Sequence, residues 1–153
     1  PDDIEAYMML GLLYQEMNDS MALQYYRTVT RMNPKDPQAY YNIAFFYQEN
    51  KNYSKAFENY NFILRNINNK YANAFFNQGY IYLIYLNDYA KALAYFDSVI
   101  QLEPNRVEAI YNKGFCYEKM HDYTSARSMY IKAKSMAENY ELAIKGLNRL
   151  DQK

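Results

Sequence analysis

The chain contains a single cysteine, Cys116, and a single histidine, His121, five residues apart in the stretch GFCYEKMHDYTSA. A thiolate beside an imidazole could act as a nucleophile with its base, and both side chains are good zinc ligands. Either chemistry needs further polar groups around the pair, such as an amide or carboxylate that orients the imidazole, or additional metal ligands. The elements that position the two residues therefore decide whether they form a site.

The composition excludes several classes of protein. The 153 residues carry 17 basic and 17 acidic side chains, so the net charge does not point to nucleic acid or an anionic membrane as a partner. No run approaches the roughly 18 apolar residues of a transmembrane helix, and the N-terminus lacks a signal-peptide pattern. We predict a soluble, folded chain without direct membrane insertion, and the lone cysteine leaves cytoplasm and periplasm both open.

The aromatic residues follow an internal repeat. The chain has 20 Tyr and 8 Phe but only four Gly and four Pro, which disfavours a fold of strands and tight hairpins. A small residue, Tyr three later, Ala eight to ten residues after that, and an aromatic residue four after the Ala recur four times, and the first members are 33, 35 and 35 residues apart. The four sets are Gly11, Tyr14, Ala22 and Tyr26; Ala44, Tyr47, Ala56 and Tyr60; Gly79, Tyr82, Ala92 and Phe96; and Gly114, Tyr117, Ala126 and Tyr130.

Each repeat is predicted to form two helices joined by a short turn. Small and aromatic residues recur at three- and four-residue spacing, which places them on one helix face, and small side chains let paired helices approach closely. Helix N-caps are expected at Asp19 or Ser20, Asp36 before Pro37, Asn52, Asp88 and Asp122. The predicted helices span residues 4–17, 20–32, 37–50, 53–66, 72–86, 89–102, 107–120 and 123–137.

The order of these positions over a period near 34 resembles the tetratricopeptide repeat (TPR) family. The stretch VEAIYNKGFCYEKMHDYTSARSMYIKAKSMAEN is similar to the family pattern throughout. The resemblance implies an all-α, right-handed superhelical solenoid of antiparallel helix pairs. Gln78 and Lys113 stand where the family usually has Leu, which predicts a wetter helix interface in the third and fourth repeats.

The repeats divide the chain into successive units of one TPR domain spanning residues 1–153. The units are expected at about 4–36, 37–71, 72–106 and 107–140, followed by a capping helix at about 140–151. Leu142, Ile144, Leu147 and Leu150 form the apolar face of that last helix. The initial PDD matches the end of a preceding unit, so we expect the chain to be a fragment of a longer array.

The repeat pattern gives Cys116 and His121 a packing role instead of a chemical one. Cys116 falls two residues after the small Gly114 of a first helix, and His121 falls in the turn where the family often has Gly. The sequence shows no third group beside the pair, no phosphate-binding loop and no nucleophile motif. We therefore predict a buried thiol and a solvated histidine, no metal or cofactor, and no enzymatic activity.

The resemblance places function on the concave surface built by the first helix of each repeat. Its sixth positions carry Met9 and then an asparagine ladder, Asn42, Asn77 and Asn112, resembling the ladders with which TPR proteins hold a peptide backbone. The fifth and ninth positions, predicted to be exposed binding anchors, are Met8 and Leu12 in the first repeat and then Tyr41, Phe45, Phe76, Tyr80, Tyr111 and Phe115. The asparagines could instead hydrogen-bond within the scaffold, and the aromatic rings could pack against neighbouring units. Glutamates at outer positions, Glu5, Glu16, Glu49, Glu108 and Glu118, are interpreted as a solvated face.

These positions predict a protein-interaction scaffold that binds an extended peptide or partner segment. Basic residues that would clamp an acidic C-terminal tail are missing from the second, fifth and sixth positions, so an apolar or basic segment suits the surface better. One alternative is a regulatory or dimerising arm of a larger protein. A remote alternative is an RNA-binding helical repeat, which needs a basic groove that this chain lacks, and the oligomeric state stays open.

Overall fold

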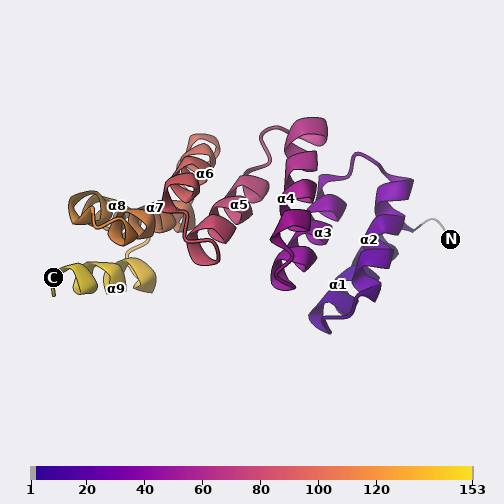
Figure 1. Cartoon of the computed structure of the whole chain (residues 1–153), viewed down its shortest axis with the longest axis horizontal. Helices are drawn as coiled ribbons and strands as arrows, with labels where there is room; N and C mark the ends of the chain where they lie inside the picture. The colour runs from indigo at the N-terminus through magenta and orange to yellow at the C-terminus, as the bar shows by residue number, and fades with distance from the viewer. Residues whose placement is uncertain (1–2, 153) are drawn as a thin grey trace. The chain divides into compact units, whose positions relative to one another are not determined.

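The computed structural model describes residues 3–152, and these residues form nine α-helices and one π-helical turn (Figure 1). Short connections join successive helices, and the predicted all-helical arrangement of sequential helix pairs is confirmed. The elements are α1 (Ile4–Glu16), α2 (Met21–Met32), α3 (Pro37–Glu49), α4 (Tyr53–Phe62), η1 (Ile63–Ile67), α5 (Ala72–Ile84), α6 (Tyr89–Leu102), α7 (Val107–Lys119), α8 (Tyr123–Met136) and α9 (Glu141–Leu150).

The predicted N-caps hold the helix starts. Asp36, Asn52, Asp88 and Asp122 each accept a hydrogen bond from a backbone N–H of the following first turn. In the first repeat Asp19 accepts from the Met21 N–H at 2.8 Å, while the Ser20 hydroxyl makes no capping bond. A residue with a positive φ lies three positions before α2 and two positions before α4, α6 and α8, namely Asn18, Lys51, Asn87 and His121. The left-handed turn therefore recurs in every repeat although no glycine occupies it.

Small residues in the first helices let the second helices come close, as predicted. A Cβ atom added to Gly11 would lie 2.3 Å from the Tyr26 ring, and one added to Gly114 would lie 2.9 Å from the Tyr130 ring. Gly146 of α9 meets the other edge of Tyr130, where an added Cβ would lie 2.6 Å from the ring. Tyr130 is therefore held between two glycines, and a larger residue at either position would displace it.

The fourth helix ends differently from its prediction. A helix was expected through residue 66, but the α-helix ends at Phe62 and continues as the π-helical turn Ile63–Ile67. The Asn68 N–H closes this turn by donating to the Ile63 carbonyl at 2.8 Å. Asn68 stands at the position of Pro34 and Pro104 in the first and third repeats. Proline has no N–H, so the wider turn is available only where Pro is replaced.

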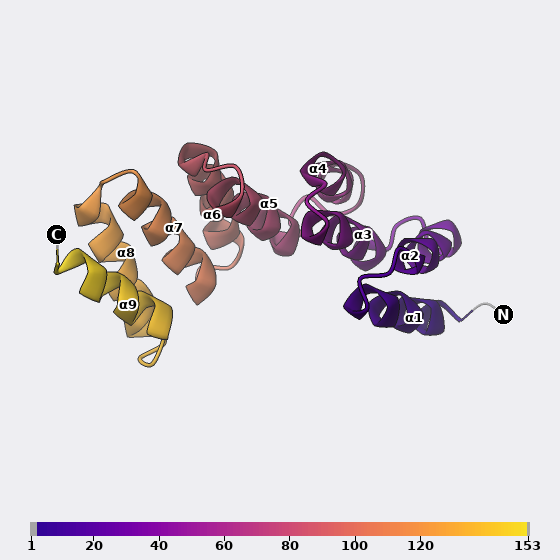
Figure 2. The same ribbon diagram turned by 60° about the horizontal axis from the view of Figure 1, so that its bottom comes forward.

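The chain divides into two compact units, one ending at Ala74 and the other beginning at Phe75. In the first unit, Ala22 and Tyr26 of α2 form a core with Ile43 and Phe46 of α3. In the second unit, one cluster joins α5, α6 and α7, and another joins α7, α8 and α9. Figures 1 and 2 show α7, α8 and α9 lying side by side within that unit.

The last helix caps the second unit, as expected. Ala143 and Leu150 of α9 are buried in one cluster with Ile110, Ala126, Tyr130 and Ala133. Ile144 and Leu147 are half-buried, but Leu142 is 46% exposed and does not belong to the buried face. The cap therefore uses Ala143 and Gly146, not Leu142, to pack closely against α8.

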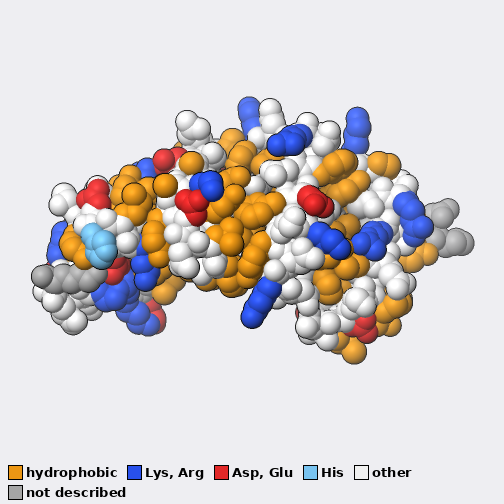
Figure 3. Space-filling view, in the orientation of Figure 1, with side chains coloured by type: hydrophobic (Ala, Val, Ile, Leu, Met, Phe, Trp, Pro, Cys, Tyr) orange, Lys and Arg blue, Asp and Glu red, His pale blue; other side chains and the backbone are white. Residues whose placement is uncertain are grey.

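The first helix exposes apolar side chains that its counterparts bury. Leu13 is 52% exposed, whereas Phe46, Ile81 and Cys116, which occupy the same repeat position, are all buried. Apolar atoms also take up much of the face seen in Figure 3. Within residues 3–152, no helix is long and apolar enough to cross a membrane.

Candidate functional site

Cys116 and His121 lie where the packing interpretation places them. Cys116 is fully buried, and this burial raises the pKa of its thiol to about 12, so the thiol stays protonated and unreactive at neutral pH. His121 is exposed in the turn before α8, and the pale blue side chain in Figure 3 is that of the single histidine. Its Nδ1 lies 2.8 Å from the Tyr123 hydroxyl. No group of three or more His, Cys, Asp or Glu side chains in the described range could hold a metal ion.

The fifth-position aromatic residues are half-buried because each packs against the second helix of its own repeat. Tyr41 contacts Tyr60, with ring centroids 5.9 Å apart, and Tyr111 stacks on Tyr130 at 5.5 Å. Phe76 meets the edge of Phe96 at 5.7 Å. These rings therefore have a structural role in addition to the surface that they present.

The ninth-position aromatic residues lie one helical turn further along the same face. The rings of Tyr41 and Phe45 are nearly parallel, with an interplanar angle of 5°, and those of Tyr111 and Phe115 make an angle of 9°. Tyr80 is half-buried and meets the edge of Tyr85 at 6.2 Å. Two stacked rings thus form a small apolar surface on α3, and two more form one on α7.

Cations of the chain cover two of these rings. The Arg106 guanidinium lies 4.3 Å from the centroid of Phe76, and Lys119 lies 5.1 Å from that of Phe115. Arg149 of α9 lies over Phe115 as well, at 5.8 Å. These surfaces therefore bind cations above their aromatic faces within the protein itself.

The three ladder asparagines lie at equivalent places but differ in their hydrogen bonding. Asn42 is 5% exposed, and its Oδ1 accepts from the Gln38 Nε2 at 2.8 Å, so part of this amide serves the scaffold. Asn77 and Asn112 are each 8% exposed. Within residues 3–152 the Asn112 side chain makes no hydrogen bond to the protein, and its amide is not fully sealed from solvent.

A polar pair that was not predicted from the sequence joins the two helices of a repeat. The hydroxyl of Tyr26 donates to Gln15 at 2.8 Å, and that of Tyr60 donates to Gln48 at 3.1 Å. Tyr130 donates to Glu118 at 2.6 Å. In the third repeat the corresponding residues are Phe96 and Leu83, both apolar. The pairing could have been predicted from the sequence, because Tyr occurs together with Gln or Glu at these two positions and Phe occurs together with Leu.

The interpretation of the glutamates as a solvated face is wrong for Glu118. Its side chain is 6% exposed, and it receives two hydrogen bonds from the Arg149 guanidinium, Nε to Oε1 at 3.1 Å and Nη2 to Oε2 at 2.8 Å. The hydrogen bonds and the charge of Glu118 raise the pKa of Arg149, which stays charged. Burial and the hydrogen bond to Glu118 raise the pKa of Tyr130, which stays neutral. The carboxylate therefore fixes α9 to the fourth repeat.

Lys113 and Gln78, which were expected to make the helix interfaces of the third and fourth repeats wetter, lie in different environments. Lys113 is half-buried and pairs with Asp97 of α6, so its charge is satisfied at the surface. Gln78 instead is fully buried, and neither of its amide atoms has a hydrogen-bond partner. The prediction of a wetter interface is therefore wrong for Gln78, which is sealed from solvent in an unfavourable state.

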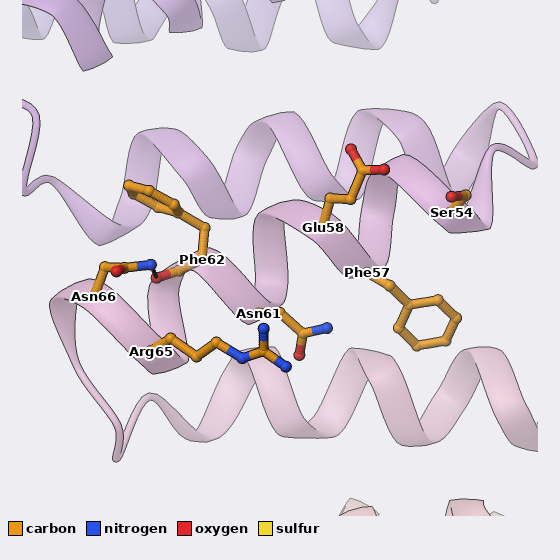
Figure 4. A pocket seen from close by; sticks show the side chains of 7 residues that line it. All are labelled: Ser54, Phe57, Glu58, Asn61, Phe62, Arg65 and Asn66. Carbon is orange, nitrogen blue, oxygen red and sulfur yellow. Dashed lines mark hydrogen bonds between the residues drawn. The ribbon is translucent and has the colours of Figure 1, made fainter.

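The surface depressions of the first unit include two of similar volume. One, of about 480 Å³, follows α4 and η1, where Figure 4 shows Phe57 and Phe62 on different sides of the helix and the Asn66 amide bonded to the Phe62 carbonyl at 3.2 Å. Its side chains do not converge on one point, so it does not form a site. The other, of about 460 Å³, lies between α1 and α3, and it contains the predicted groove residues Leu12 and Phe45.

Comparison with known families agrees with the fold. Three tetratricopeptide repeat models match residues 4–36, 25–58 and 83–147. The chain belongs to the tetratricopeptide repeat family. Members of this family are generally protein-interaction scaffolds and are typically non-catalytic.

Three similar proteins match between 56% and 97% of this chain. Photosystem I assembly protein Ycf3 of Acaryochloris marina (strain MBIC 11017) is 35% identical over 87 residues, or 56% of this chain, and the match spans 52% of that relative's length. The crystal structure of PilW, a widely conserved type IV pilus biogenesis factor, superposes with a TM-score of 0.83 at 25% identity, covering 97% of this chain and 69% of PilW. The MamA protein superposes with a TM-score of 0.75 at 20% identity, covering 90% of this chain and 75% of MamA, which shows the fold alone.

Proposed function

We propose that this chain is a non-catalytic scaffold whose first helices bind an extended peptide segment of a partner protein. Asn112 carries the proposal, because its side chain is 8% exposed and makes no hydrogen bond within residues 3–152. A peptide unit laid along α7 would satisfy both ends of that amide, since a peptide group offers one donor and one acceptor. The recognition would be independent of the partner's side chains at that point.

The stacked aromatic pairs supply the apolar part of the surface. Tyr111 and Phe115 flank Asn112 on α7, and Tyr41 and Phe45 flank Asn42 on α3. Each half-buried ring is held by the packing beneath it, so it can anchor a partner with little loss of conformational entropy. Both units therefore carry an amide and a stacked pair of rings on one first helix.

In the first unit, the charges around the first helices favour an apolar or basic segment over an acidic one. Glu5 and Glu16 of α1 and Glu49 of α3 are all exposed. An acidic segment would meet like charges at each of these points, whereas a basic one would be attracted to them. The names of two similar proteins describe assembly and biogenesis roles, which suits a scaffold.

The proposal is tested by selecting peptides from a random display library on the immobilised chain and mapping the selected peptide by amide chemical shifts. We expect the shifted amides to lie on α1 and α3 or on α5 and α7, with those of α2, α6 and α8 unchanged. Shifts confined to the second helices would contradict the proposal. Failure to enrich any sequence above the library background would contradict it as well.

A further inference from the structure

The pocket between α1 and α3 is lined by two apolar side chains, called its floor below, and two acidic ones, called its rim. Leu12 and Phe45 form the floor, and Leu12 is 47% exposed although it is a large aliphatic residue. The Phe45 ring is half-buried and stacks in parallel on Tyr41. Glu16 and Glu49 lie at the rim and are exposed. The pocket thus offers a flat aromatic surface with two carboxylates beside it.

The two carboxylates are not neutralised by the protein. The Gln15 amide donates to Glu49 Oε2 at 3.0 Å, but neither Glu16 nor Glu49 forms an ion pair in the part of the chain that the structure describes. No Lys or Arg precedes Arg27 in the sequence, and the Arg27 guanidinium donates to the Tyr47 hydroxyl at 3.0 Å. The negative charge of the rim is therefore available to a ligand.

The second unit contains a related arrangement in which cations of the chain cover an aromatic ring. There Arg149 of α9 lies 5.8 Å from the Phe115 centroid and forms its two-bond ion pair with Glu118. Phe115 has the repeat position of Phe45 and Leu12, and Glu118 has that of Gln15 and Gln48. The counterpart of Glu16 and Glu49 is Lys119, which lies 5.1 Å from the Phe115 centroid. The fourth repeat thus supplies its own cations over this ring, whereas the first two repeats have carboxylates where it has Lys119, which favours a cationic ligand in the pocket.

We infer that the pocket between α1 and α3 binds the guanidinium group of an arginine side chain carried by the partner segment. The inference deepens the proposed function and rests on it. A guanidinium is planar, so it can lie against Phe45 while its N–H groups point to Glu16 and Glu49. Its aliphatic stem would cover Leu12, which is otherwise exposed to water. A lysine ammonium offers neither the flat face nor the fork of donors, so it fits less well.

The test is a titration of the isotopically labelled chain with N-acetyl-arginine methylamide, followed by amide chemical shifts. The matched control is N-acetyl-citrulline methylamide, which has nearly the same shape but no charge. We expect saturable shifts at residues 12–18 and 45–51 with the arginine probe and an affinity about tenfold weaker, or more, with the citrulline probe. Glu16→Gln with Glu49→Gln should remove this difference without changing the spectrum elsewhere.

Equal binding of the two probes, or no saturable shift in these segments, would overturn the inference. Unchanged arginine binding in the doubly substituted chain would overturn it as well. The proposed function has a separate readout, because a library-selected peptide can still bind along α5 and α7 when this pocket takes no arginine. If the chain binds the arginine probe but no peptide from the library, the proposed function is rejected instead.

Discussion

Arg149 of the capping helix holds the buried carboxylate of Glu118 with two hydrogen bonds, of 3.1 and 2.8 Å, across 31 residues of sequence. The same carboxylate accepts from the Tyr130 hydroxyl, whose ring is enclosed by Gly114 and Gly146. One residue of the fourth repeat thereby connects α7, α8 and α9. The attachment of the cap depends on this charge in addition to apolar burial.

Replacing Arg149 with Ala should destabilise the chain by about 2–3 kcal/mol, because Glu118 would lose two charge-assisted hydrogen bonds while remaining largely buried. Urea denaturation measures this change. Adding Glu118→Leu and Tyr130→Phe to Arg149→Ala should restore part of the loss, since the pair then matches Leu83 and Phe96 of the third repeat. A loss below about 0.5 kcal/mol in the single variant would mean that the ion pair does not hold the cap.

Phe96→Tyr tests the polar pairing between the helices of a repeat. The new hydroxyl would face Leu83, which is 2% exposed and cannot accept a hydrogen bond, so we expect a loss of about 1–3 kcal/mol in the free energy of unfolding. Leu83→Gln in the same chain should recover most of it by recreating the bond of Tyr60 to Gln48, which is 3.1 Å long. Additive losses in the double variant would show that the two positions do not interact.

Gln78→Leu should stabilise the chain by about 1–2 kcal/mol. Both amide atoms of Gln78 are buried without a partner, and an apolar side chain of similar size removes that cost. Thermal denaturation is sufficient to detect the change. The matched control is Gln48→Leu, which should destabilise the chain because it removes the acceptor of the buried Tyr60 hydroxyl. A lower melting temperature for Gln78→Leu would mean that the amide is satisfied in solution.

The buried thiol of Cys116 should make the folded chain less stable at alkaline pH. Burial raises the pKa of its thiol from 9.0 to about 12, so the folded state favours the protonated form. Its contribution is complete below about pH 9, where the thiol of the unfolded chain is also protonated, and decreases as the pH rises toward about 12. Urea midpoints measured across this range should fall more steeply for the natural chain than for Cys116→Ala. Equal slopes would show that the thiol ionises as easily in the folded state.

Much of the fold follows from local patterns in the sequence. Helix starts were predictable because each depends on one capping residue and its immediate neighbours, as at Asp36 and Asp122. The burial of Cys116 followed from its place two residues after Gly114. The π-helical turn could have been suspected from Asn68 in place of proline, but its geometry depends on how the helix end packs.

Features that join distant segments were less predictable. Glu118 was expected to face solvent, since its pairing with Arg149 requires α9 to be docked first. Gln78 was expected to be wet, and only the packing around it shows that it is sealed. The candidate peptide-binding residues stay a prediction, because the half-burial of a ring such as Tyr111 serves packing and recognition equally well.

The most direct test of peptide binding along the first helices combines the affinity for a library-selected peptide with the melting temperature of Asn112→Ala. We expect the affinity to fall by about fivefold or more, equivalent to about 1 kcal/mol, while the melting temperature stays constant. Asn77→Ala should act similarly, and the two effects should add in the double variant. Asn148→Ala, at an exposed position of α9, is the matched control and should change neither quantity. Full affinity in the double variant, or a lower melting temperature with binding weakened only in proportion, would contradict the role of the asparagine ladder in binding.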